Sequence, residues 1–183
     1  MARIPYVDPK AAPAPVREVF ERLPIQLNIF KLMAHAETSF RPLLRLGTSI
    51  LGQQQLPAKL RELAILRVAR LSHAEYEWVQ HVPIAKAVGA SDAQIAALER
   101  GDPAADCFDE LERAVLRFTG EVVRDVGCSQ ATFDAVAKHL SPREIVELIL
   151  AIGFYMTVAR LMEVAKIDLD PPAGTKVVDA ALR

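Results

Sequence analysis

Apolar residues along this chain recur at intervals of three and four positions from Pro13 onward, which is the spacing of one buried face of an α-helix. They do not alternate with a period of two, as they do in half-buried strands, and only 8 of the 183 residues are glycine. The pattern therefore predicts an all-α fold. The expected helices span residues 15–23, 28–34, 37–53, 57–71, 74–88, 92–100, 108–126, 130–140 and 142–165.

Local signals support several of these boundaries. Pro57 and Pro142 suit the first turn of a helix, and Ser91 and Ser129 are placed to cap exposed N–H groups. Glycines at 89, 101 and 127 stand where helices are expected to end. The domain organisation expected from the whole pattern is an N-terminal arm over residues 1–14, one helical domain over 15–167 and an irregular C-terminal tail over 168–183.

A weak internal similarity relates two parts of the chain. At an offset of 85 residues, Glu62 falls on Glu147 and Leu63 on Leu148, and both segments open with a leucine and a proline-started helix. Two packed helical hairpins related by an approximate two-fold axis would produce this match. Similar amphipathic patterning without a true repeat would produce it as well.

Composition narrows the range of partners. The chain has 22 Lys and Arg residues against 23 Asp and Glu residues and no basic run, which argues against nucleic acid as a partner. Charged residues such as Arg143 and Glu147 interrupt the most apolar stretch, so we expect no membrane span. The prolines of the N-terminus do not fit a signal peptide, and we expect a cytoplasmic protein. Cys107 and Cys128 are too far apart for a CxxC motif and fit two ordinary thiols.

The segment from Arg61 to His81 is the most informative for chemistry. Glu62 stands near the start of an apolar helix, and the next helix carries Glu77 and His81 four residues apart on one face. If the two helices form a hairpin, Glu62 can meet His81 in a semi-buried pocket. A carboxylate beside an imidazole fixes its tautomer and tunes its pKa.

Simpler interpretations exist for each of these residues. Glu77 and His81 could form a surface contact worth about 0.2–0.5 kcal/mol, and Glu62 could only oppose the positive end of its helix. Tyr76 and Trp78 fit packing roles as well as pocket roles. A metal site is less favoured than either, because no second histidine stands at ligand spacing from His81.

Residues 61–81, and more loosely residues 40–118, resemble the carboxymuconolactone decarboxylase and alkylhydroperoxidase D (AhpD)-like family. The resemblance rests on the R-E-L-A-I-L opening, the E-Y-E-W-x-x-H ending and the separation between them. It implies an AhpD-like helical bundle and a homo-oligomer, commonly a trimer or hexamer, with its site near a subunit interface.

The peroxidase branch of this family has a Glu, then a Cys-x-x-Cys whose second cysteine precedes a His by four residues. Carried over by position, the Glu is Glu62, the two cysteines are Ala74 and Glu77, and the His is His81. Tyr76 takes the place of the histidine before the second cysteine. Thiol peroxidases need a nucleophilic thiolate and a resolving thiol, which Ala74 and Glu77 cannot supply.

The decarboxylase branch dispenses with these thiols. The resemblance thus implies a cofactor-independent lyase acting on a carboxylated lactone or related organic acid, with His81 as acid, Glu62 as its orienting partner and Glu77 as a second proton carrier. Substrate contacts are expected from Tyr76, Trp78 and an arginine, either Arg67 or Arg70. A peroxidase using Cys107 and Cys128 and a non-catalytic ligand-binding protein are the alternatives, and neither a cofactor nor a metal is expected.

Overall fold

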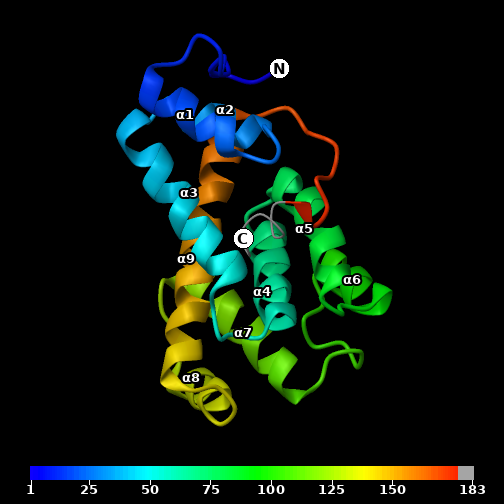
Figure 1. Cartoon of the computed structure of the whole chain (residues 1–183). Coiled ribbons are helices and arrows are strands. Elements are labelled where there is room, and N and C mark those ends of the chain that lie inside the picture. The colour runs from blue at the N-terminus through cyan, green and yellow to red at the C-terminus, as the bar shows by residue number, and fades with distance from the viewer. Residues whose placement is uncertain (177–183) are drawn as a thin grey trace.

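Residues 1–176, the part of the chain that the computed structural model describes, fold into nine α-helices without a β-strand, which confirms the predicted fold class (Figure 1). In chain order the helices are α1 (Ala14–Arg22), α2 (Asn28–Met33), α3 (Glu37–Gly52), α4 (Ala58–Leu71), α5 (Glu75–Ala87), α6 (Asp92–Glu99), α7 (Glu110–Asp125), α8 (Gln130–Ala137) and α9 (Pro142–Ala165).

Helix α4 is the centre of the bundle. It packs against α5, α7 and α9, and α6 and α8 lie outside these neighbours. Ten of its residues in succession, Leu60 to Ala69, are buried, so polar side chains such as Glu62 and Arg67 are enclosed along with the apolar ones. A helix surrounded on every side carries its chemistry into the core rather than to the surface.

The first two helices form a cap on one end of the bundle (Figure 1). Phe20 of α1 and Phe40 of α3 meet with ring centroids 5.2 Å apart. Ile29, Leu32 and Met33 of α2 are buried in the same cluster as Val158 and Met162 near the end of α9. The cap thus covers a site that α5 and α9 would otherwise expose.

Side-chain caps fix several helix starts. Ser91 and Asp109 each accept from the backbone N–H three residues later in complete capping boxes, and Ser129 caps α8 in the same way without the reciprocal bond. The Asp109 cap explains why α7 begins at Glu110 rather than at residue 108 as expected. Gly89 and Gly101 follow helix ends with φ of 99° and 79°, which glycine adopts without strain.

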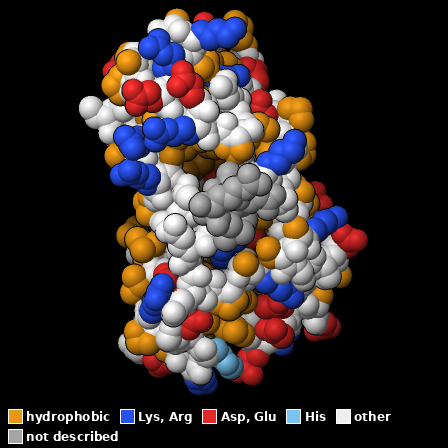
Figure 2. All heavy atoms as spheres, viewed as in Figure 1, with side chains coloured by type: hydrophobic (Ala, Val, Ile, Leu, Met, Phe, Trp, Pro, Cys, Tyr) orange, Lys and Arg blue, Asp and Glu red, His pale blue; other side chains and the backbone are white. Residues whose placement is uncertain are grey.

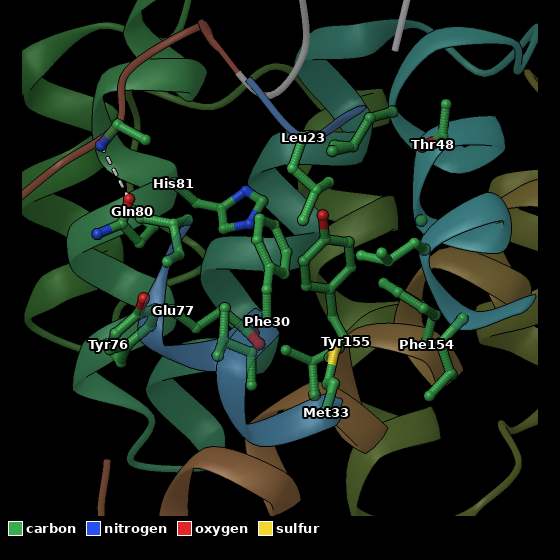
Figure 3. Close-up of a pocket in the computed structure, with 18 of the residues that line it drawn as sticks. Leu23, Phe30, Met33, Thr48, Tyr76, Glu77, Gln80, His81, Phe154 and Tyr155 are labelled. Carbon is green, nitrogen blue, oxygen red and sulfur yellow. Dashed lines mark hydrogen bonds between the residues drawn. The ribbon is translucent and has the colours of Figure 1, made fainter. Parts of the chain in front are cut away.

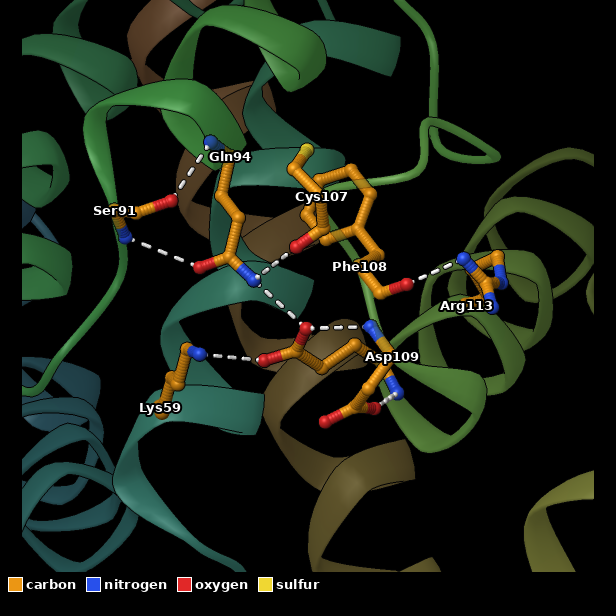
Figure 4. A network of polar contacts seen from close by, with 8 residues as sticks. Lys59, Ser91, Gln94, Cys107, Phe108, Asp109 and Arg113 are labelled. Atoms are coloured by element: carbon orange, nitrogen blue, oxygen red, sulfur yellow. Dashed lines mark hydrogen bonds and ion pairs between the residues drawn. The ribbon is translucent and has the colours of Figure 1, made fainter.

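A polar network ties α4, α6 and α7 together around Glu112 (Figure 4). One Glu112 oxygen accepts from Lys59 at 2.6 Å, and the other accepts from Gln94 Nε2 at 2.7 Å and from the Asp109 backbone N–H at 3.0 Å. Glu112 is 4% exposed, so these three donors offset the cost of removing its charge from water.

Two features bear on the sequence interpretation. The segment aligned with the α4–α5 hairpin forms a single helix, α9, so this alignment does not correspond to a second hairpin. Helix α9 is also long and apolar enough to cross a membrane by length and hydropathy alone, but core helices of soluble proteins pass the same measure, and α9 packs on α2, α3, α4, α7 and α8. The expected tail is irregular over residues 168–175, and its residues 177–183 lie outside the described part.

Candidate functional site

A cavity of about 240 Å³ lies between the N-terminal cap and the bundle. Figure 2 shows a hollow at this level with hydrophobic side chains inside it. Its walls come from the segment after α1 and from α2, α3, α5 and α9, and most of them are apolar, such as Leu23, Phe30, Met33 and Phe154 (Figure 3). The few polar side chains that reach the cavity therefore act in a poorly solvated setting.

Glu62 and His81 meet at one side of this cavity. His81 Nδ1 lies 2.8 Å from Glu62 Oε2, and Arg61 Nε donates to the other carboxylate oxygen at 3.1 Å. Glu62 is fully buried and His81 is 8% exposed. Because the carboxylate accepts, His81 carries a proton on Nδ1 and turns Nε2 to the cavity as the reactive nitrogen.

The hairpin of α4 and α5 produces this contact. His73 adopts a left-handed conformation with φ of 54°, and buried Ala74 follows it, so the chain reverses directly after α4. Glu62 in the second turn of α4 then lies beside His81 of α5. The sequence predicted this meeting, and the structure shows it within direct hydrogen-bonding distance.

Glu77 lines the cavity one helical turn before His81. It is 2% exposed, and neither of its carboxyl oxygens has a hydrogen-bond partner. Burial raises the pKa of Glu77 well above its usual range, and the negative charge of Glu62 raises it further. Arg61 already balances Glu62, so Glu77 stays protonated and presents an acidic O–H group to the cavity.

Tyr155 of α9 stands against the His81 ring. The two ring centroids are 4.7 Å apart at an interplanar angle of 87°, and the tyrosine hydroxyl points into the cavity (Figure 3). Burial raises the pKa of Tyr155 well above its usual range, and the charges of Glu62 and Glu77 add to this effect. Tyr155 is thus a neutral hydrogen-bond donor held beside the histidine.

Tyr76 and Gln80 hold a C-terminal segment across the cavity. Tyr76 donates to Asp170 Oδ2 at 2.5 Å, Gln80 Nε2 donates to the carbonyls of Asp170 and Pro171, and Gln80 Oε1 accepts from the Ala173 N–H at 2.9 Å. Ala173 and Gly174 line the cavity. We call residues 168–174 the strap.

Two residues expected at the site lie elsewhere. Trp78 packs in a separate core cluster under Arg70, whose guanidinium carbon is 4.6 Å from the ring centroid. Arg67 lines a second cavity and does not reach the first. The reason is helical geometry, because five residues separate Arg67 from Glu62 and place it about 140° around α4.

Sequence reasoning missed Arg22 and Tyr155. Arg22 ends α1, is exposed and lies on the rim of the cavity, where it replaces Arg67 as the arginine available to a substrate carboxylate. No spacing in the chain related it to His81. Tyr155 had a signal, because it continues the buried stripe of Leu148, Ala151 and Ile152, and a buried tyrosine hydroxyl usually needs a partner.

The two thiols do not contribute to this cavity. Cys107 packs beside the α4–α6 cluster, and Cys128 packs near the start of α8, where burial raises its pKa and Glu121 raises it further. Neither lines the cavity. Within residues 1–176, no group of three or more His, Cys, Asp or Glu side chains is arranged to hold a metal ion.

Comparison with known structures shows the same fold in several bacterial proteins. An uncharacterized peroxidase-related protein from Ralstonia eutropha JMP134, described as an alkylhydroperoxidase AhpD core, matches with a TM-score of 0.79 and 18% identity over 100% of this chain and 97% of its own. A peroxidase-related protein from Silicibacter sp. TM1040 matches at 0.77 and 17% over 92% of each chain. The debrominase Bmp8 in complex with 2,3,4-tribromopyrrole matches at 0.74 and 18% over 97% and 96%.

Sequence comparison points to the same group. None of the curated proteins compared with this chain matches it. The model of the carboxymuconolactone decarboxylase family matches residues 38–121, which include Glu62, Glu77 and His81. Together with the shared AhpD-like fold, this match shows that the chain belongs to the carboxymuconolactone decarboxylase and AhpD-like superfamily.

Proposed function

We propose that this protein is a cofactor-independent lyase that removes carbon dioxide from a small carboxylated lactone or related conjugated organic acid. The observation that carries the proposal is Glu77, a buried carboxyl without a hydrogen-bond partner, on the same cavity as the Glu62–His81 pair. A neutral acid and an oriented imidazole in one apolar cavity suit proton transfer.

The reaction assigns a task to each polar group. The bond between the substrate carbon and its carboxylate breaks, carbon dioxide leaves, and the electron pair enters the conjugated carbonyl system. Tyr155 and His81 donate hydrogen bonds to the oxygen where negative charge develops. Glu77 delivers its proton to carbon, and water restores that proton after product release.

Substrate binding follows from the walls and the rim. An apolar cavity of about 240 Å³ fits a small ring, and Arg22 at the rim attracts a molecule that carries a carboxylate. Glu62 acts through His81 and is a positioning residue, since its two oxygens are occupied by His81 and Arg61.

A peroxidase function is less well supported. Ala74 and Glu77 occupy the two positions where thiols act in the peroxidase branch, and neither Cys107 nor Cys128 reaches the cavity. Carboxylates without a thiol favour proton transfer over redox chemistry.

The test is carbon dioxide release from carboxymuconolactone by the purified full chain, followed together with loss of substrate absorbance. We expect Glu77→Gln and His81→Asn to lower kcat by about 10²–10⁴-fold, the usual contribution of a general acid. The controls are Glu18→Gln and His139→Asn, which change exposed residues away from the cavity and should retain wild-type rates.

Three results would overturn the proposal. Wild-type rates in His81→Asn would remove His81 from the mechanism. A compound that raises the melting temperature yet is recovered unaltered would identify a ligand-binding protein. Hydroperoxide consumption that requires a thiol reductant and is lost in Cys107→Ser or Cys128→Ser would establish redox chemistry instead.

A further inference from the structure

A second cavity lies between the C-terminal half of α4 and helix α7, and it is lined by different residues from the first. Its volume is about 450 Å³. Its charged lining consists of the arginines Arg67, Arg70, Arg100 and Arg124, the glutamates Glu75 and Glu99, and His73. Four arginines against two glutamates leave two positive charges in this cavity without a counter-charge.

Arg67 is the unusual member of this group. It is 6% exposed, yet its Nε atom is buried without a hydrogen-bond partner, and no carboxylate in the described part of the chain forms an ion pair with it. Burial lowers the pKa of Arg67, and the charge of Arg124 lowers it further. A buried guanidinium beside a like charge is costly unless an anion compensates it.

Gly120 of α7 brings the two guanidinium groups together. A Cβ atom at this position would lie 3.5 Å from Arg124 Nη1, 3.8 Å from Arg67 Nη2 and 3.9 Å from Arg67 Nε. Both arginines therefore reach the same spot on α7, where the helix lacks a side chain. Arg70, by contrast, is engaged with Glu75 and with the carbonyl of Glu99, so it closes one wall of the cavity.

We propose that Arg67 and Arg124 form a phosphate-binding site in this second cavity. Planar guanidinium groups donate in pairs to the oxygens of a phosphate, and a phosphate dianion supplies the two negative charges that the cavity lacks. The cavity is larger than one phosphate, so it admits either inorganic phosphate or a phosphate monoester of a small molecule.

The experiment is calorimetric titration of the full chain at constant ionic strength, slightly above neutral pH, where phosphate is mostly a dianion. Inorganic phosphate, phenyl phosphate and malonate are titrated separately. We expect saturable binding of one phosphate per chain, and the tighter of the two phosphate ligands identifies the source of the group.

Variants of two arginines on α7 give a matched comparison. Arg124→Gln removes an exposed cavity residue and should weaken phosphate binding at least tenfold, as expected for loss of a charged hydrogen-bond donor. Arg117→Gln removes the same charge from the same helix outside the cavity and should bind as the wild type does. Because Arg124 is exposed, its replacement leaves the core intact, which a melting curve verifies.

The proposal fails if neither phosphate ligand saturates the wild type, or if Arg124→Gln binds phosphate as tightly as the wild type. Tighter binding of malonate than of either phosphate ligand would also overturn it, because the site would then select carboxylates. An equal loss of affinity in Arg124→Gln and Arg117→Gln would show general charge attraction and no site.

Discussion

At the scale of single residues, Glu77 shows that burial decides the ionisation of a side chain even against favourable local structure. It lies in the first turn of α5, where the helix dipole favours a negative charge by about 0.3–1 kcal/mol. Complete burial without a hydrogen-bond partner outweighs this effect, and the pKa is raised. The sequence could predict that Glu77 shares a face with His81, but not that its carboxyl has no partner.

The raised pKa of Glu77 predicts how stability depends on pH. The folded protein keeps a proton that the unfolded chain releases above its ordinary pKa, so the free energy of unfolding falls as pH rises from that value toward the raised pKa. Each pH unit in this interval costs about 1.4 kcal/mol for one proton. Glu77→Gln should remove this slope in urea titrations at a series of pH values.

Glu75→Gln is the matched control for this stability measurement, because Glu75 is exposed and lies on the same helix. It should leave the pH dependence of unfolding unchanged. A wild-type slope retained in Glu77→Gln would mean that Glu77 is ionised in the folded protein, and its role as an acid would then be lost.

At the scale of elements, the strap depends on a small number of hydrogen bonds from α5. Gln80 alone makes three of them, to Asp170, Pro171 and Ala173. The prolines at 171 and 172 fix their own φ angles and stiffen the segment, so few bonds suffice to hold it in place. The strap thereby forms part of the cavity wall without belonging to a helix.

Loss of these bonds should loosen the strap while the bundle stays folded. We expect Gln80→Ala to lower stability by about 1–3 kcal/mol, because the buried Ala173 N–H loses its acceptor. Hydrogen exchange at the Ala173 amide should become faster, whereas amides within α4 should not change. Gln26→Ala, at an exposed position outside the strap, is the control. Unchanged exchange at Ala173 would contradict this account of how the strap is held.

Helices were the part of the structure that the sequence predicted best. Their boundaries follow from local rules such as capping by Ser91 and Ser129, which act within one turn. The site was only partly predictable. Glu62 and His81 are linked by one short turn, but Arg22 and Tyr155 come from α1 and α9, and only tertiary packing places them on the same cavity.

At the scale of the whole molecule, helix α9 presents an apolar face that no described part of the chain covers. Val146, Ile149 and Leu150 are 55%, 44% and 48% exposed, and their spacing places them on one side of the helix. Leu46 of α3, the helix packed beside α9, is 40% exposed. Clustered exposed apolar side chains are characteristic of protein–protein interfaces.

This face predicts self-association of the chain through α9, in line with the trimer or hexamer expected from the resemblance. Sedimentation of the wild type should give a multiple of the 20.1 kDa chain mass. Ile149→Glu should give single chains, because a charge buried in an apolar interface costs several kcal/mol. Val126→Glu replaces an 89% exposed valine outside this face and should leave the assembly intact. A wild type that sediments as single chains at micromolar concentration would leave the α9 face to a different partner.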